Sequence, residues 1–343
     1  MPNLSNMFPS LAAVQRAKET RVSRKLIDNV AASAPFFNRL SFEVIDGTQF
    51  KHRRRMGVPK IGPRPLNSGV KPSVSRYEIT NAECFPYQGI IAIDKMVADS
   101  DGRGAAVAMA EESEGVMMGA EVAIEEALIY GSQLGLPNGT VGLVDCIGDY
   151  MTISADSSKN DDEHAALGGT SVWAIQLGNE AVHGIFGNNQ GIRISPQRVS
   201  DLDINNDGKL MPAYVRDVST WVGMDNPKTY AIARLVNVDA SHPLTDDLLA
   251  DLVSLFPKNN GPTVFLMNRT AERLLRKSRT AVLQFNAGDT KQTTLAKKPT
   301  TMDEIEIIVT DCILDNETKA NIKNLGKEVE VTLRANNSHI KRL

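Results

Sequence analysis

Apolar residues recur along the chain in patterns that predict two unequal helices near its start. Between Leu11 and Val30 they recur at helical spacing with Arg and Lys between them, which predicts an amphipathic helix with one narrow apolar stripe. Residues 104–130 are rich in Ala, Val, Met, Leu and Glu and end at Gly131, which is typical of a helix stop. They predict one helix of about 27 residues, roughly 40 Å long.

Shorter segments predict strands, either because apolar and polar residues alternate or because apolar residues run together. These segments are residues 171–177, 182–186, 191–195, 211–222, 229–238, 263–267, 305–310 and 329–333. We expect 211–222 and 229–238 to pair as one long hairpin. Two shorter helices are predicted at 244–256 and 269–279, the second with Asn268 as its N-cap.

Residues 41–80 follow neither pattern for long. Residues 41–50 alternate enough for a strand and 76–80 can resume as one, but the segment between them holds four prolines, three glycines and many basic residues. The prolines exclude a helix and disfavour a central strand. Because a long structureless loop is unusual inside a compact domain, we predict an extended two-stranded arm that reaches away from the body. A disordered basic linker is the alternative.

The charge is unevenly distributed, although the net charge of the 343 residues is only −3. Residues 1–80 hold 14 Lys/Arg and 5 Asp/Glu, a net charge of +9, and the other residues hold 24 and 36, a net charge of −12. A basic first quarter on an acidic body can bind nucleic acid or the acidic body of a neighbouring copy. The glutamates of the long helix have no lysine partners on that helix, so we favour the second option.

Nothing in the chain predicts catalysis, a cofactor or a metal site. The three cysteines and five histidines are scattered without ligand spacing, and there is no Walker, G-x-S-x-G or G-x-G-x-x-G motif. Asp203–Gly208 fits half of a calcium loop but lacks the Glu at position 12, so we interpret it as a turn. Residues 187–191 are interpreted as a hairpin turn, and His183 and Trp173 as residues that fill or edge a sheet. No apolar segment is long enough to span a membrane.

Several motifs in a fixed order resemble the major capsid proteins of small tailed bacteriophages. The long helix ends in Glu-Glu-Ala-Leu-Ile-Tyr-Gly, after an upstream Glu-Gly pair. Downstream come Thr-Ser-Val-Trp-Ala-Ile-Gln-Leu-Gly, then Val-His-Gly-Ile-Phe-Gly, then Ile-Ala-Arg-Leu-Val-Asn and Leu-Met-Asn-Arg. Each motif is short, but their shared order over residues 100–316 supports the family.

The resemblance implies an α+β fold, the tailed-phage major capsid fold, divided into an N-terminal arm (1–40), an extended β-hairpin loop (41–80), a peripheral domain and an axial domain. The peripheral domain would hold 81–160 and 212–238, including the spine helix 104–130 and the long hairpin. The axial domain would hold 161–211 and 239–343. Such subunits assemble as hexamers and pentamers into an icosahedral shell around double-stranded DNA. The resemblance therefore implies a virion protein assembled in the bacterial host cytoplasm, with portal and scaffold or decoration proteins as further partners.

The basic loop would then overlap the acidic spine helix of the adjacent subunit. The residues expected in this contact are Lys51, Arg53, Arg54, Arg55, Lys60, Arg64, Glu111, Glu112, Glu114, Glu121 and Glu125. Two other functions remain open from the sequence. One is a nucleic-acid-binding protein that uses the basic first quarter, and the other is the shell protein of a cellular nanocompartment.

Overall fold

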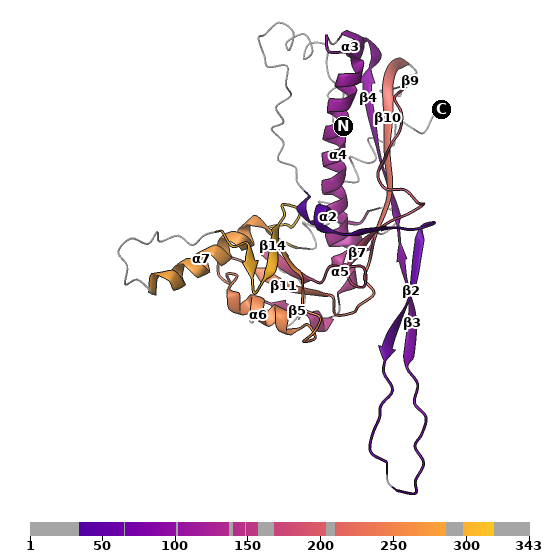
Figure 1. The fold of residues 1–343 in the computed structure, drawn as a ribbon. Coiled ribbons are helices and arrows are strands. Elements are labelled where there is room, and N and C mark those ends of the chain that lie inside the picture. Colours follow the sequence, from indigo (N-terminus) through magenta and orange to yellow (C-terminus); the bar gives the residue numbers. More distant parts are fainter. Residues whose placement is uncertain are drawn as a thin grey trace.

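The computed structural model describes residues 34–64, 66–100, 102–136, 140–147, 149–156, 168–203, 210–285 and 298–318. Several predicted elements lie outside these residues: the helix 11–30, most of the Asp203–Gly208 turn and the strand 329–333. Figure 1 shows three parts: a tall unit around one long helix, a second unit beside its lower end, and a thin two-stranded arm.

The tall unit is built on one exceptionally long strand. Its sheet has the order β1-β7-β10-β4, namely β1 (Phe42–Val44), β7 (His183–Phe186), β10 (Met211–Asp225) and β4 (Phe85–Asp94). β4 runs antiparallel along one edge of β10, and β7, β8 (Arg193–Ile194) and β9 (Arg198–Leu202) follow one another along β10 as well. The 15 residues of β10 therefore act as the central strand to which most of this sheet is paired.

The second unit is a six-stranded mixed sheet with helices. Its order is β13-β14-β12-β6-β11-β5. The strands are β5 (Thr152–Ser154), β6 (Thr170–Ile175), β11 (Ile232–Val238), β12 (Val264–Met267), β13 (Thr301–Met302) and β14 (Ile305–Val309). The helices are α6 (Asp246–Ser254) and α7 (Arg269–Phe285). Asn268 caps α7 as predicted, because its Oδ1 accepts a hydrogen bond from the Ala271 N–H at 2.8 Å.

The alternation of side chains along β6 explains why every residue of that strand is buried. Val172 and Ala174 face the core formed with α6 and α7, whereas Trp173 and Ile175 face the core formed with the end of the long helix. A strand covered on both faces needs apolar side chains on both, so β6 reads as a continuous apolar run. The sheet thus lies between two helical layers.

The long helix is α4 (Ala105–Tyr130), which confirms the predicted spine helix almost to the residue. It follows α3 (Lys95–Ser100) and precedes the short helices η2 (Gly131–Leu134), α5 (Leu143–Cys146) and η3 (Asp149–Met151). Gly131 ends α4 at φ 51° and ψ −122°. A side chain is excluded there, because a Cβ would lie 2.2 Å from the Gly142 nitrogen. The helix begins after Gly104, which is its N-cap residue.

Two predictions of strand pairing were wrong. The segment 229–238 does not form a hairpin with 211–222, because β11 pairs with β5 and β6 in the other sheet while β10 pairs with β4. The predicted division therefore places β11 in the peripheral domain and its neighbour in the sheet, β6, in the axial domain. Residues 187–191 are not a hairpin turn either, since β7 and β8 lie end to end along β10.

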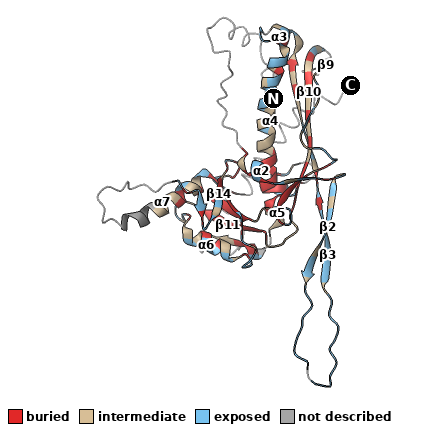
Figure 2. Cartoon of the chain, viewed as in Figure 1, coloured by how far each residue is buried: buried red, intermediate tan, exposed pale blue. Residues whose placement is uncertain are grey.

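The predicted arm is a two-stranded antiparallel sheet of β2 (Gln49–Gly57) and β3 (Arg76–Glu83), which pairs with neither larger sheet. The chain between its strands continues outward as a loop, away from both units (Figure 1). Figure 2 shows the arm exposed along most of its length, in contrast to the buried lower end of α4. The interpretation as a projecting arm is confirmed for the described residues.

Candidate functional site

The arm presents a different chemistry on each of its faces. Phe50, His52 and Arg54 are partly buried, whereas Lys51, Arg53 and Arg55 alternate with them and are exposed. The guanidinium of Arg53 lies over the Tyr77 ring at 3.7 Å, and that of Arg55 lies at 5.5 Å. This stacking holds two cations on the outer face, where they remain accessible to another molecule.

Arg54 has a different environment, because it pairs with Glu78 across the arm at 2.8 Å. Its charge is therefore partly neutralised within its own chain. Lys60 and Arg64 lie further out, in the exposed loop between the strands. Of the predicted basic contacts, Lys51, Arg53, Arg55, Lys60 and Arg64 are exposed, and Arg54 also has a role inside the arm.

The tip of the arm also exposes a set of large aliphatic side chains. Ile61 is 98% exposed, and Leu66 and Val74 are 91% and 87% exposed. Val58 and Val70 belong to the same loop and are also exposed. A thin loop cannot bury such residues by itself, and several together mark a surface that contacts another molecule.

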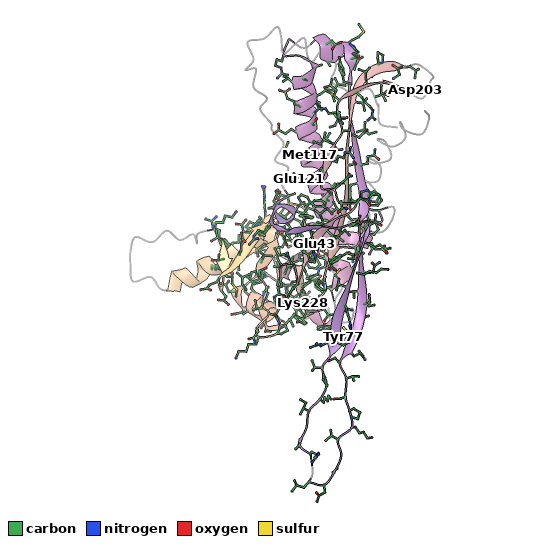
Figure 3. All side chains as sticks on the ribbon, turned by 45° about the vertical axis from the view of Figure 1, so that its right-hand side comes forward. Glu43, Tyr77, Met117, Glu121, Asp203 and Lys228 are labelled. Atoms are coloured by element: carbon green, nitrogen blue, oxygen red, sulfur yellow. The ribbon has the colours of Figure 1, made fainter. Side chains whose placement is uncertain are left out.

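The acidic residues of α4 fall into three environments. Glu112 and Glu114 are exposed and Glu121 is partly buried. Glu111 forms an ion pair with Arg103 at 2.6 Å, so part of its charge is also neutralised within the chain. In Figure 3, Glu121 on α4 lies well above Tyr77 on the arm. The chain therefore does not bring its own arm cations and spine carboxylates together.

Glu125 is not available for contact with a neighbour, which corrects its assignment to that surface. The residue is completely buried where α4 meets α2 (Pro35–Arg39) and the end of β14. Its carboxylate accepts hydrogen bonds from the Phe37 N–H, at 2.9 Å, and from the Thr310 hydroxyl. Burial raises the pKa of Glu125, and these hydrogen bonds oppose that shift. Its function is to join three segments of the fold.

The Glu125→Gln variant should become more stable relative to wild type as the pH rises from 4 to 7. Because the pKa of Glu125 is higher in the folded state than the ordinary 4.5, its carboxyl group stabilises the fold at low pH. This contribution is lost as the pH rises above 4.5. Gln has no proton to lose, and its amide can serve both partners. Glu125→Ala, which leaves the Phe37 N–H unpaired, should lose about 2 kcal/mol at pH 4 and less at pH 7, because wild type itself loses stability over this range. Urea unfolding measures both variants. A Gln advantage that shrinks with pH would contradict this assignment.

A second buried ionic group was not foreseen from the sequence. Arg234 on β11 donates to Glu317 at 2.7 Å and to the Ser171 hydroxyl at 3.0 Å, and its guanidinium lies 4.7 Å from the Trp173 ring centroid. Glu317 also accepts from the Tyr130 hydroxyl at 2.8 Å. These residues are far apart in the chain, so no local pattern indicates their contact.

A groove of about 370 Å³ lies between the second unit and the root of the arm, which is the part of the arm nearest the body. It is predominantly basic, because Glu180 is the only carboxylate among its lining residues, which are His52, Arg53, Arg54, Arg55, Met56, Glu180, Pro227, Lys228, Thr229 and Tyr230. Figure 3 places Lys228 between the body and the arm. The positive charge of this groove suits the binding of an acidic side chain.

The described residues show neither of two other kinds of site. Among them, no three His, Cys, Asp or Glu side chains are arranged to hold a metal ion. In the same part of the chain, no helix combines the length and apolar character needed to cross a membrane.

Known proteins share the family and the fold of this chain. The family model for "Major capsid protein GP7" matches residues 24–321. A chain in the structure of bacteriophage epsilon15 has a TM-score of 0.71 at 18% identity, over 93% of this chain and 99% of that chain. A chain in the capsid of bacteriophage JBD30, decorated with minor capsid protein trimers, has a TM-score of 0.52 at 9% identity, over 88% and 98%.

A search of curated proteins gave no match. The two structures show a shared fold, and the family model covers most of the chain. The predicted resemblance to tailed-phage major capsid proteins is confirmed, and the alternative functions are not favoured. The chain belongs to the major capsid protein GP7 family and is a structural subunit of a tailed-phage capsid.

Proposed function

We propose that each subunit lays its arm against the acidic spine helix of the next copy, within hexamers and pentamers that close into an icosahedral shell around double-stranded DNA. As a major capsid protein the chain is located in the virion and assembles with copies of itself. The arm contact is the step that would join one copy to the next.

The observation that carries the proposal is the projecting arm, whose cations and aliphatic side chains are left uncovered by the described part of their own chain. The outer face of the arm carries Lys51, Arg53 and Arg55, and the loop beyond it adds Lys60 and Arg64. Glu112 and Glu114 are exposed on α4 and provide the opposite charge. Complementary charges select the partner and its orientation, and aliphatic contact excludes water from the joint.

The packaged DNA would contact the shell without sequence preference. The body of the subunit is acidic, so it would tolerate DNA more than bind it. Portal and scaffold or decoration proteins are further proposed partners, with assembly in the bacterial host cytoplasm. In this arrangement α4 and the β10 sheet form the peripheral domain. The sheet that contains β11, with α6 and α7, forms the axial domain.

A charge exchange between arm and spine tests the contact directly. Reversing the arm with Arg55→Glu, Lys60→Glu and Arg64→Glu should prevent shell formation, because carboxylates would then face Glu112 and Glu114. Reversing the spine with Glu112→Arg and Glu114→Arg should do the same. Combining both sets of reversals in one chain should restore particles, measured by light scattering and negative-stain microscopy.

The matched control reverses charge in the same way but avoids the proposed surface. Asp247→Lys and Asp251→Lys change two carboxylates on α6, in the second unit. This variant should assemble like wild type. If the arm variant assembles normally, the proposed contact is wrong. If the chain with both sets of reversals stays unassembled, the spine helix is not the partner of the arm.

A further inference from the structure

The root of the arm rests on a cluster of two imidazoles and two carboxylates that neither the fold nor the proposed contact requires. His52 of the arm and His183 of β7 approach the same oxygen of Asp225, the last residue of β10. Nδ1 of His52 lies 3.2 Å from Asp225 Oδ2, and Nε2 of His183 lies 3.7 Å from it. Glu43 of β1 lies 3.8 Å from Nε2 of His183. Asp225 is 3% exposed and His183 is 1% exposed.

The hydrogen bonds determine where protons can be. Nδ1 of His183 lies 3.1 Å from the carbonyl oxygen of Ala181, which can only accept, so Nδ1 carries a proton. In a neutral ring Nε2 would then present a lone pair to the oxygens of Asp225 and Glu43. Those contacts become favourable only when Nε2 also carries a proton. His52 lies within ion-pair distance of the same carboxylate, but its Nδ1 forms no hydrogen bond there, and its Nε2 is hydrogen-bonded with the Thr80 hydroxyl.

We infer that this cluster is a proton-dependent latch that fixes the arm to the body. With a proton on Nε2, His183 compensates the buried Asp225, and His52 ties the arm to the same carboxylate. When that proton leaves, Asp225 is a buried anion without a counter-charge, which is costly. The arm is the least enclosed element over the cluster, so its root opens and admits water. The latch is therefore closed at lower pH and loosens as the pH rises.

The groups around the cluster agree with this assignment. Burial raises the pKa of Asp225, and the imidazoles of His52 and His183 oppose that shift. Burial also raises the pKa of the Cys146 thiol to about 12, so that thiol stays neutral. The next cation of β2, Arg54, is paired with Glu78. Phe50 of the arm packs edge-on against the His183 ring at 6.4 Å and limits the access of water.

Hydrogen exchange of unassembled full-length subunits tests the latch between pH 5.5 and 8.5. After correction for the intrinsic rate, backbone protection at the arm root, in residues 49–53 and 79–83, should fall about tenfold as the pH rises. Asp225→Asn should remove this dependence. His242→Gln is the matched control, because it changes a histidine beside Asp156 and Asp239, away from the arm. It should leave the arm profile unchanged.

The milder variant Glu43→Gln tests the latch even if Asp225→Asn does not fold. Glu43 is half exposed, and Glu43→Gln removes one of the two carboxylates that hold the proton. The midpoint of the protection change should move down by about half a pH unit. A flat wild-type profile, an unchanged slope in Asp225→Asn or an unmoved midpoint in Glu43→Gln would overturn the latch. The measurement uses single subunits, so it is independent of whether the arm contacts the spine helix of a neighbour.

Discussion

A subunit that lacks the loop between β2 and β3 should fold with unchanged stability and fail to form shells. Gly57 and Arg76 are paired across the two strands, so residues 58–75 can be replaced by an Asn-Gly turn without moving β2 or β3. The aliphatic residues removed are exposed and add nothing to a core. We expect thermal unfolding within about 1 °C of wild type, since surface changes of this kind alter stability little. Particle yield should fall below detection by negative-stain microscopy.

A variant with the same loop length distinguishes the loss of apolar contact from the loss of arm length. Replacing Val58, Ile61, Leu66, Val70 and Val74 with Ser keeps the loop length and its cations but removes the aliphatic surface. If the tip binds by apolar contact, this variant should also fail to assemble at concentrations where wild type forms shells. Normal assembly of the shortened subunit would show that the tip is dispensable. Normal assembly of the Ser variant alone would assign the contact to charge.

Glu317→Ala should destabilise the fold by about 3–5 kcal/mol, which is more than the loss expected for Glu125→Ala. The carboxylate is completely buried and compensates Arg234, which is 5% exposed. Its loss leaves a guanidinium without its counter-charge and the Tyr130 and Ser171 hydroxyls without an acceptor. Urea unfolding of unassembled subunits measures the effect.

An exposed ion pair provides the matched control. Arg39 and Glu306 lie 3.0 Å apart, but both side chains are about half exposed. Glu306→Ala should therefore cost less than about 1 kcal/mol, because water and salt already screen that pair. Equal losses for Glu317→Ala and Glu306→Ala would mean that burial of the Arg234 pair does not determine its contribution.

The elements that could be predicted from the sequence are those with a strong local signal. The prolines and basic residues of 51–76 indicated the arm, and the composition of 104–130 indicated α4. Strand partners carry no such signal. The strand β4 was not assigned, because Pro86 and Gly89 interrupt its pattern. Pro86 is tolerated because β4 lies at the edge of its sheet.

Glu121 and Glu125 show why the contact residues could be predicted only in part. They are one helical turn apart on the same face, so periodicity gives both the same role. The difference lies in what covers the helix: the last turns of α4 are enclosed by the second sheet and α2, whereas its first half packs on β4 and β10 along one face and is exposed on the other (Figure 2). That difference depends on segments far away in the chain, as does the pairing of Arg234 with Glu317.

The position of Glu317 also determines when this protein can finish folding during translation. Arg234, Ser171 and Tyr130 emerge from the ribosome long before their shared carboxylate has been synthesised. β12 likewise waits for β14, with which it pairs in parallel. The arm hairpin relies on residues made earlier, whereas the last turns of the spine helix also wait for Thr310 and Glu317. A nascent chain therefore exposes its arm while the second sheet still lacks β14, and the buried Arg234 gains its counter-charge only when synthesis has passed residue 317.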